Sequence, residues 1–191
     1  LDFDFNQSGG RVGVAMRAGH LEIPGLFDEP KMPFDQLFGD VRWTRDGTRL
    51  SVDVPNLRFS NADAQGQLQL KWKTGDERLY PGVLDLQGTL SRADAGRVYR
   101  YLPTSIPKSV RDYVQSAVPS GSAAMVKFKV KGQLDDFPFE TAKQGEFRIS
   151  ANLKDVSYDY APALVLDKGS PPWPALAHAS GELVIDRSVL Q

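Results

Sequence analysis

The chain has 191 residues, a formal net charge of −1 and no cysteine. This length is enough to bury a sizeable core as one large domain or two small ones. The near-neutral charge, with lysine and arginine scattered singly, gives no reason to expect nucleic acid or an acidic membrane as a partner. The missing cysteine excludes disulfides, thiolate metal sites and a cysteine nucleophile. The chain begins without methionine, in what reads as mid-strand, which predicts a piece of a longer protein.

Residues 1–82 alternate apolar and polar side chains, which predicts a meander of antiparallel strands. The expected strands cover residues 1–5, 11–18, 20–23, 35–44, 48–54, 57–59 and 64–73. Turn signals such as Asp46-Gly47 separate them, and the three prolines of residues 24–33 predict a loop or an edge there. In the last of these strands Leu68, Leu70 and Trp72 share one face.

Residues 83–139 predict a strand, a short helix, a longer helix and a second strand. The first strand covers residues 83–90, with Leu84 and Leu86 on its apolar face, and the helices cover residues 93–101 and 107–117. Ser91 and Asp94 have the spacing of a capping box. The apolar helical stripe predicts burial against the sheet for Val98, Leu102, Val110 and Val114. The alternative for this stripe is a lid or a membrane-surface helix.

The second strand of this region, residues 125–132, has the clearest alternation in the chain. Val126, Phe128 and Val130 point to one face, while the lysines between them point to the other. A turn is expected over residues 134–139. Further strands are expected over residues 145–153, where Phe147 and Ile149 share a face, over 156–160, and over 179–191, after an irregular proline-rich stretch at 162–174.

These patterns predict a mainly β fold: an antiparallel curved sheet or open groove, rolled or sandwich-like, with one inserted helical hairpin. We expect one β-rich segment of a larger protein. Its parts are the meander of residues 1–82, the strand–helix–helix–strand insert of residues 83–139 and the C-terminal strands of residues 140–191.

The sequence carries little catalytic or metal-binding chemistry. The pair Asp2 and Asp4 lacks a third ligand nearby, and His20 and His178 lack metal-ligand spacing. Asp135-Asp136 is a poor carboxylate dyad, because adjacent residues in a turn point apart. No nucleophile elbow, dinucleotide fingerprint or phosphate-binding loop occurs. We therefore expect no enzyme, no metal and no cofactor.

Several motifs made of aromatic residues, glycine and proline resemble one region of the YhdP family. They are Tyr101-Leu102-Pro103, the helix end at Val118 and Gly121, Lys131-Gly132, Leu134, Phe137-Pro138-Phe139, Gly145-Glu146-Phe147, residues 158–162 and Trp173-Pro174. The resemblance is clearest over residues 83–191. It implies a large AsmA-like protein of the Gram-negative envelope with an inner-membrane anchor. It also implies a long periplasmic β-structure, rolled into an apolar groove and implicated in moving phospholipid toward the outer membrane.

Three functional hypotheses follow. The first is a lipid conduit whose partners are phospholipid acyl chains, neighbouring segments of the same protein and, as a further group, other envelope proteins. Its candidate groove residues are Leu68, Leu70, Trp72, Leu84, Leu86, Val126, Phe128, Val130, Phe147 and Ile149. The second is a structural or protein-binding module of the periplasm. The third is a glycan binder that uses Trp43, Trp72 and Trp173. A continuous apolar trough in the structure would favour the first hypothesis over a closed core.

Overall fold

The computed structural model describes residues 2–162, 171, 173–187 and 189–190. Its strands form a single antiparallel sheet in which the spatial order follows the chain order, so that each strand pairs with the next. The strands are β1 (Asp2–Asn6), β2 (Gly9–Glu22), β3 (Lys31–Asp46), β4 (Arg49–Ser60), β5 (Ala64–Lys73), β6 (Val83–Asp94), β7 (Ser120–Gln133), β8 (Gly145–Tyr158), β9 (Leu176–Asp186) and β10 (Val189–Leu190). The prediction of a mainly β, antiparallel fold is confirmed.

Helical structure interrupts the meander between β6 and β7. It consists of the 3₁₀ helix η1 (Ala95–Tyr101) and the helix α1 (Lys108–Ala117), which we call the insert together with the residues that join them. A further 3₁₀ turn, η2 (Leu134–Asp136), follows β7. The predicted helical hairpin is confirmed, although its first helix is of the tighter 3₁₀ type.

The capping box predicted at the start of the insert is wrong for Ser91, whereas Asp94 does cap the helix. The Asp94 side chain caps η1 by accepting a hydrogen bond from the Gly96 amide at 2.9 Å. Ser91 still lies within β6, where its hydroxyl donates to the Gln65 carbonyl oxygen at 3.2 Å. The strand therefore continues four residues beyond the predicted end at residue 90, and a single carboxylate begins the helix.

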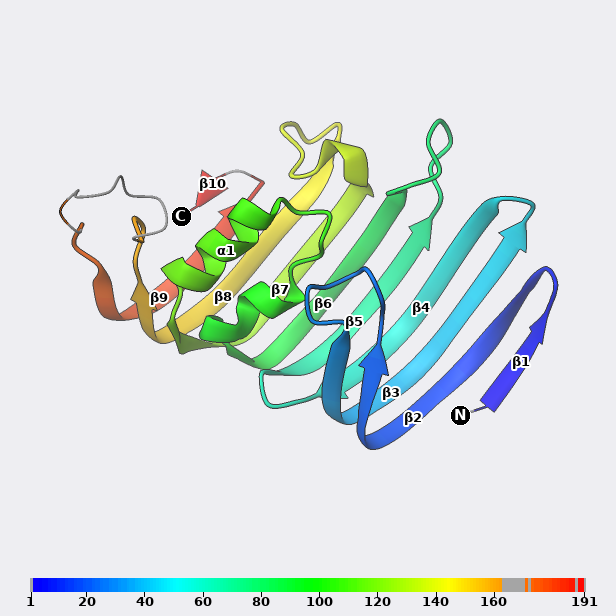
Figure 1. Ribbon diagram of the computed structural model, residues 1–191, viewed down its shortest axis with the longest axis horizontal. Helices are drawn as coiled ribbons and strands as arrows, with labels where there is room; N and C mark the ends of the chain where they lie inside the picture. The colour runs from blue at the N-terminus through cyan, green and yellow to red at the C-terminus, as the bar shows by residue number, and fades with distance from the viewer. Residues whose placement is uncertain (1, 163–170, 172, 188, 191) are drawn as a thin grey trace.

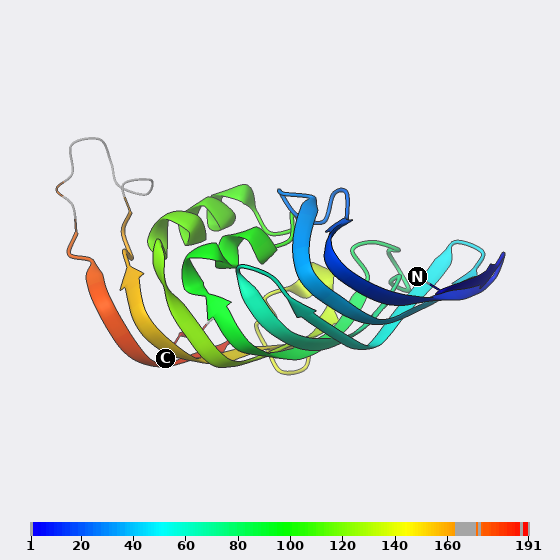
Figure 2. The same cartoon turned by 90° about the horizontal axis from the view of Figure 1, so that it is seen from below.

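The sheet is open and curved, and one face is partly covered (Figure 1). Figure 2 shows that the insert and the loop between β2 and β3 both lie on the inner side of the curve. We call this side the inner face and the opposite side the outer face. Strands β1 and β10 lie at opposite edges of the sheet.

Strands expected to be short and separate are long and continuous. The predicted strands 11–18 and 20–23 form the single strand β2, 48–54 and 57–59 form β4, and 145–153 and 156–160 form β8. In β4 and β8 the structure places a β-bulge at the predicted break, where the pairing register shifts, and in β8 Asp155 has a positive φ of 55°. In β2 the register against β3 does not shift, and the predicted break coincides with the positive φ of Ala18, 50°. A bulge bends a strand without ending its pairing. The row of bulges accounts for the curvature that Figure 2 shows.

The bulges also keep apolar side chains on one face. In β4, Val54 pairs with Leu70 and Leu57 pairs with Leu68, because the two residues Pro55 and Asn56 lie opposite the single residue Gln69. Without this bulge a three-residue step would move Leu57 to the outer face. Proline is tolerated here because a bulged residue need not donate a ladder hydrogen bond.

At the C-terminal side the predicted strand 179–191 begins earlier, as β9 from Leu176, and is followed by β10. The irregular stretch predicted for residues 162–174 lies mostly outside the described residues, as do residues 188 and 191. The buried apolar residues are few for a chain of this length: Met32, Leu37, Val54, Ala64, Ala117, Val126, Phe139, Ala151 and Val156. A single sheet layer with limited cover explains this, because much of its inner face has no second layer to pack against.

Candidate functional site

The pairing register brings the ten candidate groove residues together on the inner face. Across β5 to β8 they form four adjacent rows. The first row pairs Trp72 with Leu84, and the second joins Leu70, Leu86, Val130 and Phe147. The third row contains Leu68, Phe128 and Ile149, and in the fourth Val126 lies opposite Leu90. Directly paired side chains in an antiparallel sheet lie about 5 Å apart, so each row is a continuous apolar strip. The rows together form an apolar surface that crosses four strands.

This surface is neither a closed core nor fully bare. Nine of the ten candidates are half-buried, and Val126 is buried at 7% exposure. The neighbouring Lys127 and Lys131 are exposed and belong to the outer face, as the alternation predicts. The inner face thus offers accessible hydrocarbon surface over its central rows.

Sequence reasoning missed the part of this surface that lies on β4. Val52 pairs with Trp72, Val54 with Leu70, and Leu57 with Leu68, so the rows continue by one more strand. Leu37 of β3 pairs with Phe59 and extends the surface further. Each half of β4 shows the alternation of a strand. The bulge at Pro55-Asn56 interrupts this alternation, so the sequence does not indicate that the apolar residues of the two halves share a face.

Glycines make room for the large side chains of the surface. Gly88 pairs with Phe128, and a Cβ atom built on Gly88 would lie 2.4 Å from Phe128 Cζ. The Phe128 ring therefore lies flat over the neighbouring strand instead of standing away from the sheet. A side chain at position 88 would push this ring toward solvent.

An aromatic cluster covers the inner face where β7 and β8 meet at their turn. Phe139 is fully buried and packs against Gly132 and Gly145, which pair with each other. Phe137 lies edge-on to Phe147, with ring centroids 5.0 Å apart. The sequence predicted only a turn over residues 134–139. The sequence signal for the buried Phe139 ring was the pair of glycines, because two paired glycines leave a gap on the sheet that an aromatic side chain fills.

Trp72 is fixed at the same end of the strands. Its indole Nε1 donates to the Pro81 carbonyl oxygen at 2.9 Å, and its ring stacks on Tyr80 with centroids 5.9 Å apart. Trp43 lies in the same row as Trp72, opposite Val52. Trp173 instead lies edge-on to Tyr160, just after β8, with ring centroids 5.8 Å apart. The three tryptophans proposed for a glycan site are therefore divided between two regions, and no shared platform connects them through these contacts.

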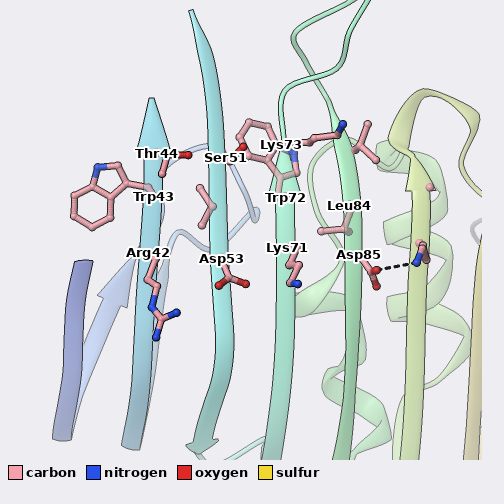
Figure 3. Close-up of a pocket in the computed structure, with 14 residues that line it drawn as sticks. Arg42, Trp43, Thr44, Ser51, Asp53, Lys71, Trp72, Lys73, Leu84 and Asp85 are labelled. Atoms are coloured by element: carbon pink, nitrogen blue, oxygen red, sulfur yellow. Dashed lines mark ion pairs between the residues drawn. The ribbon is translucent and has the colours of Figure 1, made fainter. Parts of the chain in front are cut away.

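The outer face carries charged side chains in register. Arg42, Asp53, Lys71, Asp85, Lys131 and Glu146 form one row of alternating sign across β3 to β8. Figure 3 shows four members of this row side by side, with the Asp85–Lys131 ion pair, whose N–O distance is 3.1 Å. A hollow of about 600 Å³ crosses these strands, and of the ten candidates only Trp72 and Leu84 line it. Opposite charges in paired positions stabilise a solvated sheet face.

The insert and the β2–β3 loop cover the other end of the inner face. The predicted burial of the helical stripe is wrong for two of its four residues: Val98 is 43% exposed and Val110 46% exposed, while Leu102 and Val114 are half-buried. The buried side chain of this stretch that sequence reasoning missed is Arg111, at 8% exposure. The insert is held to the rest of the protein by polar contacts as well as by apolar packing, which helical periodicity does not reveal.

Two arginines make these polar contacts. Arg111 forms a bidentate pair with Asp28, with N–O distances of 2.8 and 3.0 Å, and also donates to the carbonyl oxygens of Thr104 and Ile106. Arg100 pairs with Glu29 at 2.8 Å and with Asp63 at 2.5 Å. The hydrogen bonding that Arg100 donates to the Glu29 carboxylate is the largest cause that raises the pKa of Arg100.

Tyr101 joins this network to the β4–β5 turn. Its hydroxyl donates to Asp63 at 3.0 Å and accepts from the Asn61 amide at 2.9 Å. Burial is the largest cause that raises the Tyr101 pKa to about 12. Both turn residues are buried, so the network is a structural joint between the insert and the sheet.

The described residues provide surface for hydrocarbon and little else for chemistry. Among them, no group of three histidine, aspartate or glutamate side chains is placed to hold a metal ion. No helix in the described ranges has the length and apolar character to span a membrane. The feature with the clearest binding capacity is the half-exposed apolar surface of the inner face.

Comparison with known proteins gives one match. The family model described as YhdP protein matches residues 1–191. The match covers the N-terminal meander as well as residues 83–191, where the sequence motifs were clearest. No curated protein and no solved structure matches the chain.

Proposed function

Given that the chain belongs to the YhdP family, we propose that it is a segment of an AsmA-like envelope protein that carries phospholipid between the inner and outer membranes. The observation that supports this proposal best is the continuous, half-exposed apolar surface on the inner face of a single curved sheet. In the proposal, acyl chains lie on this surface in place of a second protein layer.

The energetics favour an apolar occupant. Removing apolar surface from water stabilises by roughly 25 cal/mol per Å². The half-exposed side chains of Phe128, Ile149, Leu70 and Leu86 therefore gain free energy when hydrocarbon covers them. Hydrocarbon chains need no hydrogen bonds, so such a surface needs no particular polar residue. It should tolerate exchange of one apolar residue for another, and it should not tolerate charge.

The proposed setting is the periplasm. In this proposal an inner-membrane anchor holds the full-length protein, and neighbouring segments continue the sheet at its two edges. Strand edges carry unpaired backbone groups that pair readily with further strands. The proposed function requires neither catalysis nor a cofactor, and we propose other envelope proteins as further partners.

The open sheet also supports a second candidate, a structural or protein-binding module. A half-exposed apolar face can be covered by a protein partner as well as by lipid. The two candidates differ in what the inner face contacts in the working protein. Protein contacts would involve matching polar groups at the rim, whereas lipid would contact the central rows alone.

Lipid analysis of the full-length protein tests the proposal. Phospholipid should co-purify with the wild-type protein and be detected by mass spectrometry. Phe128→Asp and Ile149→Asp should abolish lipid passage and co-purification in protein that still folds, because each places a charge on the apolar rows. Lys129→Ala, on the outer face, should leave both unchanged. Equal lipid content in all four proteins would contradict the conduit.

A further inference from the structure

The hollow of about 600 Å³ on the outer face runs across the strands between two neighbouring rows of side chains. One is the charged row from Arg42 to Lys131, and the other contains Thr44, Ser51, Lys73 and Val83. Leu70 and Leu86 of the inner face do not line the hollow, so it opens on the outer face. Figure 3 shows the strands that it crosses.

A second hollow, of about 480 Å³, continues the first toward β9. The two adjoin at Lys131 and Gly132, which line both of them. Phe139 packs on Gly132 and Gly145 from the inner face and does not line the second hollow, so this hollow also opens on the outer face. We call the two hollows together the outer groove.

Cations outnumber carboxylates along the outer groove. The first hollow is lined by four lysines and arginines and the second adds three, against two carboxylates in each. Three of the four carboxylates already have a cationic partner. The N–O distances are 3.1 Å for Lys131–Asp85, 2.6 Å for Lys129–Glu146 and 3.2 Å for Arg187–Asp186.

The unpaired cations are the more exposed groups. Among the described residues, five lining cations have no ion-pair partner: Arg42, Lys71, Lys73, Lys143 and Arg148. All five are exposed, whereas the four carboxylates are half-buried. Lysine and arginine lay their stems along a surface and keep the charged end in water. A molecule that approaches the outer groove therefore meets positive charge first.

The dimensions of the outer groove fit an extended chain. Neighbouring strands lie about 4.8 Å apart, so a groove from β3 to β9 spans about 29 Å. An extended polypeptide advances about 3.3 Å per residue, so about nine residues fill this length. Because rows of side chains border the first hollow on both sides, a single chain can enter it and a flat membrane surface cannot.

We propose that the outer groove binds an extended acidic segment of a partner protein, whose carboxylates pair with these five cations. Ion pairs at an exposed surface set specificity and association rate more than affinity, and salt weakens them. This inference goes beyond the proposed lipid function, since it concerns the opposite face of the sheet and does not depend on the conduit.

Crosslinking to a defined peptide tests the inference. In the full-length protein, a photo-crosslinking phenylalanine analogue replaces Ser51, which lines the outer groove, in one version and Gln67 in another. Gln67 is exposed on the same face outside the groove, in one row with the exposed Arg58 and Lys127, so it samples diffuse positive charge. The probe is a fluorescent nine-residue peptide of alternating glutamate and threonine, and its control has glutamine in place of glutamate.

Two double variants remove equal charge from the same face. Lys71→Gln with Lys73→Gln removes two cations of the outer groove, and Arg58→Gln with Lys127→Gln removes two cations outside it. Position 51 should capture the glutamate peptide at least tenfold more than position 67 does, and at least tenfold more than it captures the glutamine peptide. The first double variant should lower this capture at least fivefold, and the second should leave it unchanged, in protein whose circular dichroism matches the wild type.

Equal capture at positions 51 and 67, or equal loss in the two double variants, would overturn the inference and reduce the outer groove to diffuse surface charge. Capture of phosphatidylglycerol vesicles at position 51 in place of the peptide would also overturn it, in favour of a membrane-facing surface. Neither result alters lipid capture at position 128, so failure of this inference is distinct from failure of the conduit.

Discussion

The two ends of the inner face are covered in different ways. Where β7 meets β8, Phe139 packs on the backbone of Gly132 and Gly145 and is fully buried, so the cover is local and apolar. At the opposite strand ends the cover comes from the insert and from the loop between β2 and β3, residues 23–30. It is joined by Arg100 and Arg111 to carboxylates far away in the chain.

The difference separates a cover made of aromatic packing from a cover joined by polar groups. Phe139 packs against the backbone of two strands and lies edge-on to Phe137, with ring centroids 5.7 Å apart, so this cover is part of the sheet itself. The ion pairs at the other end involve largely buried arginines and join segments that are distant in the chain. The central rows between the two ends have neither kind of cover, and they are the surface proposed to carry lipid.

The largest expected effect concerns the aromatic wall. Phe139→Ala should destabilise by about 3–5 kcal/mol, because it removes a buried ring and leaves a cavity over two glycines that cannot fill it. Phe137→Ala is the matched control, since Phe137 is only half-buried and should cost clearly less. Urea unfolding of the two variants measures the difference. Equal losses would mean that the wall has no special role.

The next effect concerns the polar contacts of Arg111. Arg111→Ala should destabilise by about 1–3 kcal/mol, because the carbonyl oxygens of Thr104 and Ile106 lose their donor. Lys108→Ala removes an exposed pair with Asp112 on the same helix and should cost only about 0.3–0.5 kcal/mol. Arg111 also binds Asp28 of the loop between β2 and β3, so hydrogen exchange should show that Arg111→Ala loosens this loop and the insert more than the central strands. Uniform loosening of the whole sheet would contradict a local role for Arg111.

A smaller effect depends on pH. The pKa of Tyr101 in the folded protein is raised from 10.0 to about 12, mainly by burial. A raised pKa means that the folded state favours the neutral phenol, so this contribution is complete below about pH 10 and is lost as the pH rises toward 12. Unfolding free energies measured across this window should fall less steeply for Tyr101→Phe than for the wild type. Parallel curves would show that Tyr101 does not couple the insert to the sheet.

The smallest effect is expected on the outer face. Lys71→Ala removes one exposed member of the charged row and should change stability by less than about 0.5 kcal/mol. The same change should leave lipid content unaltered, because Lys71 points away from the apolar rows. A loss of lipid in this variant would place the functional surface on the wrong face.

Much of the fold could be predicted from the sequence because alternation is a local property. Strand β5 was predicted at its observed bounds, Ala64–Lys73, and the insert nearly so. The breaks predicted inside β4 and β8 are bulges, which look like strand ends in the sequence, since both interrupt the alternation. Only pairing with a neighbouring strand distinguishes the two, and pairing is not a local property.

In the candidate site, too, features that are local in the chain could be predicted and contacts between distant residues could not. Each candidate residue was found from its own strand, and the register places all ten on one face. The contact between Arg111 and Asp28 was missed because the two residues are far apart in the chain, and no local pattern connects them. Val98 and Val110 were wrongly expected to be buried, since an apolar helical stripe usually packs on a sheet. Here polar contacts carry part of that attachment.

Photo-crosslinking at two adjacent positions tests the central claim most directly. Phe128 lies on the inner face and Lys129 on the outer face, so a crosslinker at each samples opposite sides of one strand. In the full-length protein, position 128 should capture phospholipid and position 129 should not. Equal labelling at the two positions, or none at 128 in folded protein, would contradict the conduit and leave the structural module.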